Sequence, residues 1–159
     1  MRAWLGLGAN LGDPVATLNE AKARLAHIGR VTAESSLYRT PPWGVVEQPP
    51  FVNAALALET NLDPDALLAA LKALERALGR VASVRWGPRA IDVDILDYEG
   101  VRRDDPALTI PHPRLLERAF VLVPLAEIEP AFAAARDALP PGDLAAVERI
   151  GPFEREGVR

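Results

Sequence analysis

Two carboxylates, Asp92 and Asp94, stand two residues apart in the largely apolar segment AIDVDILDY, residues 90–98. If this segment is a strand, side chains two positions apart point to the same face, with their Cα atoms roughly 7 Å apart. Two like charges at this spacing repel each other, and a divalent cation between them removes that penalty. Magnesium suits the pair because it binds one or two protein carboxylates and completes its coordination with water and phosphate oxygens. Asp97 has the opposite parity and is expected to lie outside the pair.

The residues upstream favour a phosphate-bound metal over the alternative, a solvated sheet face on which the aspartates pair with arginines. The stretch between Glu75 and Asp92 contains no acid and four arginines, namely Arg76, Arg80, Arg85 and Arg89. Guanidinium groups and magnesium are the two groups that proteins use to hold polyphosphate. We therefore predict that this part of the chain binds a small polyanion.

The composition argues against several other classes of protein. The chain has 159 residues, 49% of them hydrophobic, which fits a globular protein. Its net charge of −4 argues against a nucleic-acid partner or an anionic membrane surface. It has no cysteine, and we expect neither a membrane span nor a secretory signal. The glycine-rich start GLGANLG lacks the third glycine of the dinucleotide fingerprint, and no P-loop or G-x-S-x-G motif occurs. We expect one domain, residues 1–159, in the cytoplasm.

The elements that must position these residues alternate in a regular order. The Asp-Pro pairs at 13–14 and 63–64 predict helix starts, because aspartate accepts a hydrogen bond from the free N–H groups and proline fits the first helical position. Apolar residues at helical spacing follow each start, as far as Gly29 and Gly79. Four further stretches predict strands: RAWLGLG, RVTAESSLY, FVNAALALE and AIDVDILDY. The order β-α-β-β-α-β predicts an α+β, ferredoxin-like fold, in which an antiparallel sheet carries both helices on one face.

A C-terminal extension follows this unit from about residue 99. It predicts a hairpin at DYEGV, short helices divided by prolines, and a loosely held end, GPFEREGVR. Within the strand FVNAALALE, alternation places Phe51 and Asn53 on one face and Val52 and Ala54 on the other.

At these motifs the chain resembles the 6-hydroxymethyl-7,8-dihydropterin pyrophosphokinase family of folate biosynthesis. The resemblance rests on LGLGANLGDP, YRTPPWG, FVNAALALET, RWGPRAIDVDIL and LTIPHPRLLERAFVLVPL, in that order, and it weakens after about residue 130. It implies transfer of the β,γ-pyrophosphoryl group of ATP to the hydroxymethyl group of a reduced pterin, which releases AMP. It also implies two Mg2+ ions bound with the ATP, and a monomer.

The same resemblance assigns residues to the site. Asp92 and Asp94 would bind the metal, and three arginines would contact the triphosphate or close the catalytic loop: Arg80, Arg85 and Arg89. The nucleotide would be held by Glu75, Arg89, Ile95, Thr109, His112 and Arg118. The pterin would be held by Thr40, Pro41, Trp43, Phe51, Asn53, Trp86 and Phe120. Phe51 and Phe120 would sandwich the flat ring, and Asn53 would bind its amide edge. Ala82 and Ala107 stand where many relatives carry arginine, which leaves the details of loop closure open.

Two other functions stay open on the residues alone. A metal-dependent glycosyltransferase also uses a D-x-D pair to hold a nucleotide diphosphate, although this chain is short and shows no sugar-nucleotide domain. A ferredoxin-like regulatory module would bind a nucleotide without turning it over, and would need neither Asp92 nor Asp94.

Overall fold

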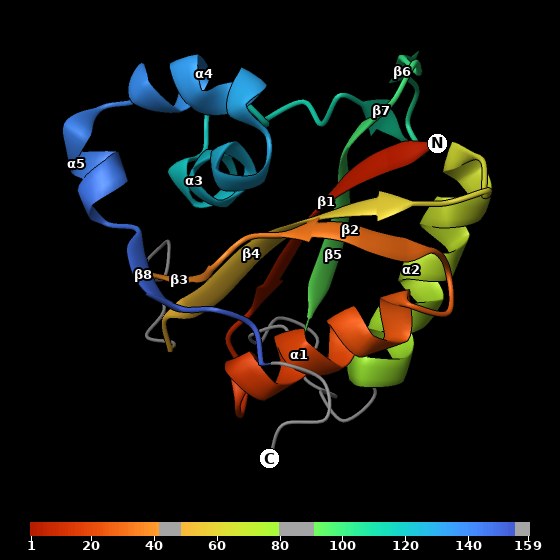
Figure 1. The fold of residues 1–159 in the computed structure, drawn as a ribbon, viewed down its shortest axis with the longest axis horizontal. Coiled ribbons are helices and arrows are strands. Elements are labelled where there is room, and N and C mark those ends of the chain that lie inside the picture. Colours follow the sequence, from red (N-terminus) through yellow and green to blue (C-terminus); the bar gives the residue numbers. More distant parts are fainter. Residues whose placement is uncertain (42–48, 80–90, 155–159) are drawn as a thin grey trace.

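In the part of the chain that the structure describes, a six-stranded antiparallel sheet carries helices on both faces (Figure 1). The computed structural model describes residues 1–41, 49–79 and 91–154. The strands of the sheet are β1 (Arg2–Ala9), β2 (Arg30–Glu34), β3 (Leu37–Thr40), β4 (Phe51–Glu59), β5 (Asp92–Tyr98) and β8 (Glu148–Gly151). A separate pair is formed by β6 (Arg103–Asp104) and β7 (Thr109–Ile110). The helices are α1 (Pro14–Leu25), α2 (Pro64–Gly79), α3 (Ala119–Ile128), α4 (Ala133–Asp137) and α5 (Pro141–Ala145), with a 3-10 turn at Pro130–Phe132.

The strand order confirms the predicted α+β fold. Strand β1 pairs with β5 on one side and with β4 on the other, both antiparallel. The far edge of β4 pairs with β2 along one half of its length and with β3 along the other, and β8 pairs with β3. With β2 and β3 taken together as the second strand, this is the β-α-β-β-α-β arrangement that the sequence predicts.

Helices α1 and α2 pack on one face of the sheet, as expected. Asp13 accepts a hydrogen bond from the N–H of Ala16 (3.1 Å) and Asp63 accepts one from the N–H of Ala66 (2.8 Å), so both predicted helix starts are confirmed. Their buried leucines meet the side chains of β1, β4 and β5 in one core, which includes Leu5, Leu18, Leu25, Leu56, Leu67, Leu71 and Val93. This core fixes the strands whose opposite faces are free to form a site.

The C-terminal extension covers part of the opposite face. Helix α3 lies against it, on the far side of the sheet from α1 and α2 (Figure 1). Leu125 of α3 is fully buried against Ala55 of β4 and Leu96 of β5. The extension thus adds a third layer, which brings the N-terminal end of α3 over the sheet.

The predicted strand RVTAESSLY is interrupted at Ser35 and Ser36, which separate β2 from β3. The N–H of Ser35 donates to the carbonyl of Ala55 (2.9 Å), and its hydroxyl accepts from the N–H of Ala55 (2.9 Å). Ser36 instead directs its N–H and its hydroxyl to the carboxylate of Glu127 in α3 (2.9 Å each). The break therefore leaves the N–H and the hydroxyl of Ser36 outside the strand pairing, where they hydrogen-bond to α3 and connect the third layer to the sheet.

The expected parity of Asp97 is wrong, because the pairing of β5 with β1 shifts next to Leu96. Leu5 pairs with Ile95, but the next residue of β1, Trp4, pairs with Asp97. Directly paired residues share a face, so Asp97 lies on the same side of the sheet as Trp4. Tyr98 takes the core side in its place.

The extension differs from its prediction in two further places. The chain turns after β5, where the N–H of Val101 donates to the carbonyl of Tyr98 (3.1 Å), but β6 pairs with β7, so the hairpin prediction is wrong. The end of the chain is not loosely held up to residue 154, because β8 pairs with β3 and Phe153 is only 3% exposed. Residues 155–159 lie outside the described part.

Helix α1 ends at Leu25, before the predicted Gly29. Gly29 is needed for another reason: a Cβ at this position would lie 2.4 Å from the carbonyl oxygen of Glu59. Among the described residues, no helix combines the length and the apolar character that crossing a membrane requires.

Candidate active site

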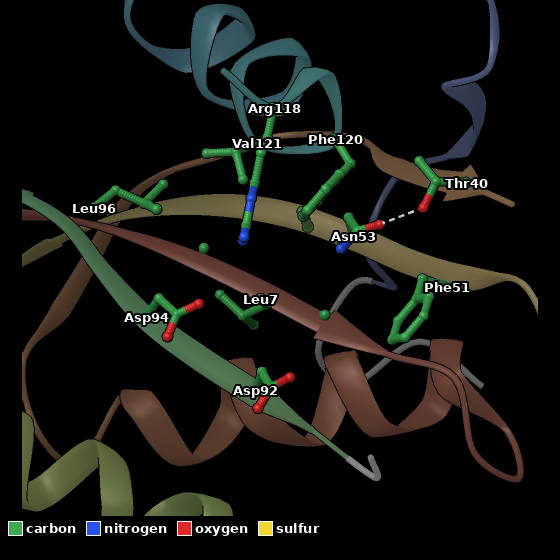
Figure 2. A pocket seen from close by; sticks show the side chains of 13 residues that line it. Leu7, Thr40, Phe51, Asn53, Asp92, Asp94, Leu96, Arg118, Phe120 and Val121 are labelled. Atoms are coloured by element: carbon green, nitrogen blue, oxygen red, sulfur yellow. Dashed lines mark hydrogen bonds between the residues drawn. The ribbon is translucent and has the colours of Figure 1, made fainter. Parts of the chain in front are cut away.

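A cavity of about 270 Å3 opens between the sheet and the N-terminal end of α3 (Figure 2). Strands β1, β4 and β5 form its floor and sides, and residues of α3 cover it from above. The cavity is lined by Gly6, Leu7, Gly8, Thr40, Phe51, Asn53, Ala54, Asp92, Asp94, Leu96, Arg118, Phe120 and Val121. Seven residues that the sequence assigned to the site therefore meet in one place: Thr40, Phe51, Asn53, Asp92, Asp94, Arg118 and Phe120.

The floor of the cavity is the central strand, which presents glycine at two successive positions of this face. Gly8 pairs with Asn53 on β4 and with Asp92 on β5, and Gly6 pairs with Asp94 on β5. A Cβ on Gly8 would lie 2.8 Å from the side-chain nitrogen of Asn53, so the amide occupies the space that a side chain would take. These glycines do not match the dinucleotide fingerprint, so that motif gives no sign of the floor. Their i, i+2 spacing within a predicted strand was the signal that could have found the floor.

One wall carries the two carboxylates. Asp92 and Asp94 project from β5 into the cavity, whereas Val93 and Ile95 are buried in the core on the other face (Figure 2). The prediction that the aspartates share a face is confirmed. No group of three or more histidine, aspartate or glutamate side chains that could hold a metal ion occurs among the described residues. Two carboxylates on one wall fit Mg2+, which takes its remaining ligands from phosphate and water.

Glu75 reaches this wall from behind. Its Oε2 accepts a hydrogen bond from the backbone N–H of Val93 (2.7 Å), and its Oε1 lies 3.2 Å from the Nζ of Lys72. Glu75 is not among the residues that line the cavity. The structure therefore places Glu75 beside the aspartates and outside the lining of this cavity, and its contact with the nucleotide stays a prediction.

The opposite wall combines aromatic rings with a fixed amide. Phe120 reaches down from α3 toward the sheet near Asn53, and Phe51 lies farther along β4 (Figure 2). The hydroxyl of Thr40 donates to the Oδ1 of Asn53 (2.9 Å), and both side chains are buried. Pro41 lines a neighbouring cavity of about 690 Å3, which shares three residues with the first, namely Thr40, Arg118 and Phe120.

Arg118 is the cation that the described residues place in the cavity lining. Its side chain extends from the start of α3 into the space between the two walls (Figure 2). The guanidinium carbon lies 5.6 Å from the ring centroid of Phe120, which is within the range of a cation–π interaction. A cation here can face an anionic ligand on the carboxylate side and the ring of Phe120 on the aromatic side.

His112 borders the site through the backbone. Its N–H donates to the carbonyl of Leu96 (2.8 Å), and its Nδ1 accepts from the N–H of Arg114 (3.2 Å). Burial lowers the pKa of His112 below its ordinary value; the charge of Asp94 opposes this, while those of Arg118 and Arg114 add to it. A neutral imidazole with an acceptor role at Nδ1 carries its proton on Nε2, so it can donate one hydrogen bond there.

Other assigned residues fall away from the cavity or outside the described part. The side chain of Ile95 is 4% exposed in the core beneath the sheet, because the alternation of β5 turns it away from the aspartates. The assignment of Ile95 to the nucleotide site stays a prediction. Thr109 lies in β7 and does not line the cavity. Five assigned residues lie outside the described part of the chain: Trp43, Arg80, Arg85, Trp86 and Arg89.

The chain is similar to known proteins of one enzyme family. Residues 4–130 match the family model described as 7,8-dihydro-6-hydroxymethylpterin-pyrophosphokinase. The chain is 50% identical over 155 residues to a 2-amino-4-hydroxy-6-hydroxymethyldihydropteridine pyrophosphokinase of Methylorubrum extorquens, covering 94% of this chain and 98% of that one. It is 44% identical over 128 residues to the protein of the same name from Bacillus subtilis, covering 79% and 77% of the two chains.

A solved structure of similar fold is Plasmodium falciparum HPPK-DHPS, wild type, with pterin and p-hydroxybenzoate. The TM-score is 0.67 at 17% identity, over 86% of this chain. The match covers 42% of the Plasmodium chain, so this chain spans less than half of its length. At this identity the likeness shows the fold alone.

Proposed function

Because the chain belongs to the 7,8-dihydro-6-hydroxymethylpterin-pyrophosphokinase family and is therefore an ATP-using pyrophosphokinase of folate biosynthesis, we propose that its cavity binds both substrates side by side. The observation that carries the proposal is the contrast between the two walls. Over one glycine floor, β5 presents two carboxylates, whereas β4 and α3 present rings and a buried amide. A triphosphate with its metal suits the first wall, and a flat heterocycle suits the second.

On the aromatic side, the ligand is 6-hydroxymethyl-7,8-dihydropterin. Phe51 and Phe120 supply apolar ring surfaces, on which a pterin stacks. Asn53 supplies a carboxamide that matches the hydrogen-bonding edge of the pterin. The hydroxyl of Thr40 donates a hydrogen bond to the Oδ1 of this carboxamide. The hydrogen bond from Thr40 thus fixes the side chain of Asn53 before the ligand binds. Trp43 and Trp86, which lie outside the described part, stay in the proposal as residues that close over the ring.

On the carboxylate side, Asp92 and Asp94 would hold Mg2+ with the phosphates of ATP. When bound there, Mg2+ supplies charge neutralisation for the phosphate oxygens. Arg118 extends toward the same space and contributes a second source of positive charge. Arg80, Arg85 and Arg89, which lie outside the described part, remain proposed phosphate ligands, and His112 can donate from Nε2.

The reaction needs positioning more than a covalent group from the protein. The hydroxymethyl oxygen of the pterin forms a bond to the β-phosphorus of ATP. The bond from that phosphorus to the α,β-bridging oxygen breaks, AMP leaves with the electron pair, and the hydroxyl proton is released. Residues of the two walls hold the hydroxymethyl group and the triphosphate in line, and the residues above the cavity exclude water.

The test is to identify the nucleotide that is released. We expect the protein to form AMP only when ATP, Mg2+ and 6-hydroxymethyl-7,8-dihydropterin are all present. Replacing one carboxylate, as Asp92→Asn or Asp94→Asn, should lower kcat/KM by at least about 100-fold, since losing several kcal/mol of charge stabilisation costs about tenfold for each 1.4 kcal/mol. Both variants should keep the wild-type circular dichroism, because these side chains are not in the core.

The other outcomes have definite meanings. ADP in place of AMP would contradict pyrophosphoryl transfer. Bound ATP without turnover would favour a regulatory module, and turnover of a nucleotide sugar would favour a glycosyltransferase. A monomer and a cytoplasmic location are also part of the proposal, and sedimentation of the purified protein and fractionation of the source cells test them.

A further inference from the structure

We propose that Glu75 is a positioning residue for the metal-binding pair, rather than a ligand of the nucleotide. The inference rests on the proposed function, in which Asp92 and Asp94 hold the metal with ATP. The carboxylate of Glu75 accepts a hydrogen bond from the backbone N–H of Val93 (2.7 Å). Val93 is the single residue between the two aspartates. A shift of Val93 moves both carboxylates, because their backbones are bonded to it directly.

The strand needs such a brace because β5 is at the edge of the sheet. Among the residues that the structure describes, β1 is the one strand that pairs with β5, so the other side of β5 is an edge of the sheet. The N–H of Val93 is directed to that open side, since its hydrogen bond is to a helix side chain and not to β1. An edge strand without an acceptor at this point can shift or fray. Glu75 supplies this acceptor at Val93, between the two aspartates.

Helix α2 holds Glu75 in place firmly enough for this purpose. Leu71 and Leu74 of the same helix are buried in the main core. The Glu75 side chain is 15% exposed, and Lys72 one turn earlier balances its charge at 3.2 Å. A hydrogen bond from a backbone N–H to a carboxylate is among the stronger neutral–charged contacts, and groups that orient metal ligands typically affect metal affinity or activity by 10–100-fold.

Three variants separate positioning from the alternatives. Glu75→Ala removes the acceptor, Glu75→Gln keeps an acceptor but loses the charge, and Lys72→Ala removes only the exposed ion-pair partner. The readouts are the hydrogen exchange of the Val93 amide by NMR, the binding of Mn2+ with a non-hydrolysable ATP analogue by calorimetry, and the binding of the pterin.

We expect Glu75→Ala to speed exchange at Val93 by at least about tenfold, a loss of about 1.4 kcal/mol of protection. It should weaken metal–nucleotide binding by about 10–100-fold and leave pterin binding within about twofold. Glu75→Gln should restore most of both effects, and Lys72→Ala should match the wild type. If Glu75→Ala does not fold, a Glu75→Gln protein with protected Val93 and near-normal metal binding still supports the inference.

Two results would overturn it. Faster exchange at Val93 with unchanged metal–nucleotide binding would show that the hydrogen bond from Val93 to Glu75 does not affect the position of the aspartates. Equal losses in Glu75→Gln and Glu75→Ala, with Val93 still protected in the glutamine variant, would show that the charge acts on the nucleotide directly. Asp94→Asn serves as the reference: if it binds Mn2+ and the analogue like the wild type, the proposed metal site itself fails, which is a different result.

Discussion

Gly8 contributes to the cavity because it has no side chain, which leaves space for the amide of Asn53. The amide of Asn53 lies over it, and Thr40 holds the amide from the other side. The proposed pterin side of the cavity therefore depends on Gly8, a strand residue without a side chain. An aromatic pocket on a sheet needs such a gap, because a side chain on the central strand would fill the space between the walls.

We expect Gly8→Ala to weaken pterin binding selectively. Its Cβ would lie 2.8 Å from the Nδ2 of Asn53, so the amide must leave its position. Losing about one hydrogen bond's worth of binding, near 1.4 kcal/mol, raises the KM for the pterin about tenfold, with a smaller effect on the KM for ATP. Steady-state kinetics with each substrate varied in turn measure this.

Gly6→Ala is the matched control on the same strand. The atoms nearest to its Cβ would belong to the flexible side chain of Leu96, the first at 3.2 Å, and this side chain can adjust. We expect its KM for the pterin to stay within about threefold of the wild type. If Gly8→Ala shows the same small change, the amide of Asn53 is not fixed by the absence of a side chain at Gly8.

Among the elements, β3 and α3 are joined by a partly buried polar network that the interrupted strand makes possible. The carboxylate of Glu127 accepts from the N–H and hydroxyl of Ser36 and from the hydroxyl of Tyr38 (2.5 Å). Arg149 of β8 donates to the hydroxyl of Ser36 (2.8 Å), so three elements meet there. Burial, and then Glu127, raises the pKa of Tyr38 to about 12. The network anchors the helix whose other end carries Arg118 and Phe120.

This network predicts a stability change at high pH. Between pH 10 and about 12 the unfolded chain loses the phenol proton of Tyr38 while the folded chain keeps it. The unfolded state then binds fewer protons, so the free energy of unfolding falls as pH rises through this window. Tyr38→Phe removes that contribution. It should also lower the free energy of unfolding at neutral pH by about 1.5–3 kcal/mol, the range for hydrogen bonds to charged groups.

Urea unfolding of both proteins, from neutral pH to above pH 10, provides the measurement. The difference between wild type and Tyr38→Phe should be constant below pH 10 and shrink above it. A constant difference across the whole range would contradict the raised pKa.

Local sequence patterns predicted the helices and strands, but they did not predict the break between β2 and β3 or the register shift within β5. The Asp-Pro helix starts and the shared face of Asp92 and Asp94 follow from hydrogen bonding and strand alternation, which act over a few residues. The break at Ser35 and the shift at Leu96 depend on partners distant in sequence, Ala55 and the strand β1. A serine in an alternating stretch gives no local sign of such a partner. Strand alternation also predicts the core position of Ile95, whose assignment to the nucleotide rests on the family resemblance alone.

In the molecule as a whole, the C-terminal extension completes the fold on both sides of the sheet. Helix α3 covers one face, and Phe153 is buried in the core of the other. The sequence around Phe153 has no helical or strand periodicity, so its burial could not be predicted from local pattern. The match to the family model ends at residue 130 of this chain, yet β8 and Phe153 beyond it are part of the packed fold.

We expect Phe153→Ala to lower the free energy of unfolding by about 3–5 kcal/mol, the usual cost of removing a buried aromatic ring. Lys22→Ala is the control, because the Nζ of Lys22 lies 5.2 Å from the centre of this ring and pairs with Glu34. It should cost about 1 kcal/mol or less. Urea unfolding of both variants should show one cooperative transition, as the proposal of a single domain over residues 1–159 requires. A cost below about 1 kcal/mol for Phe153→Ala would contradict the buried position.

The central claim is that one glycine-floored cavity holds the metal-bound triphosphate on its carboxylate wall and the pterin on its aromatic wall. The measurement that tests it most directly is a crystal structure with Mg2+, 6-hydroxymethyl-7,8-dihydropterin and an ATP analogue whose α,β-bridge is a methylene group. We expect metal bound by Asp92 and Asp94, the pterin between Phe51 and Phe120, and its hydroxymethyl oxygen facing the β-phosphorus. A triphosphate bound away from the two aspartates, or a pterin in the neighbouring cavity lined by Pro41, would contradict the claim.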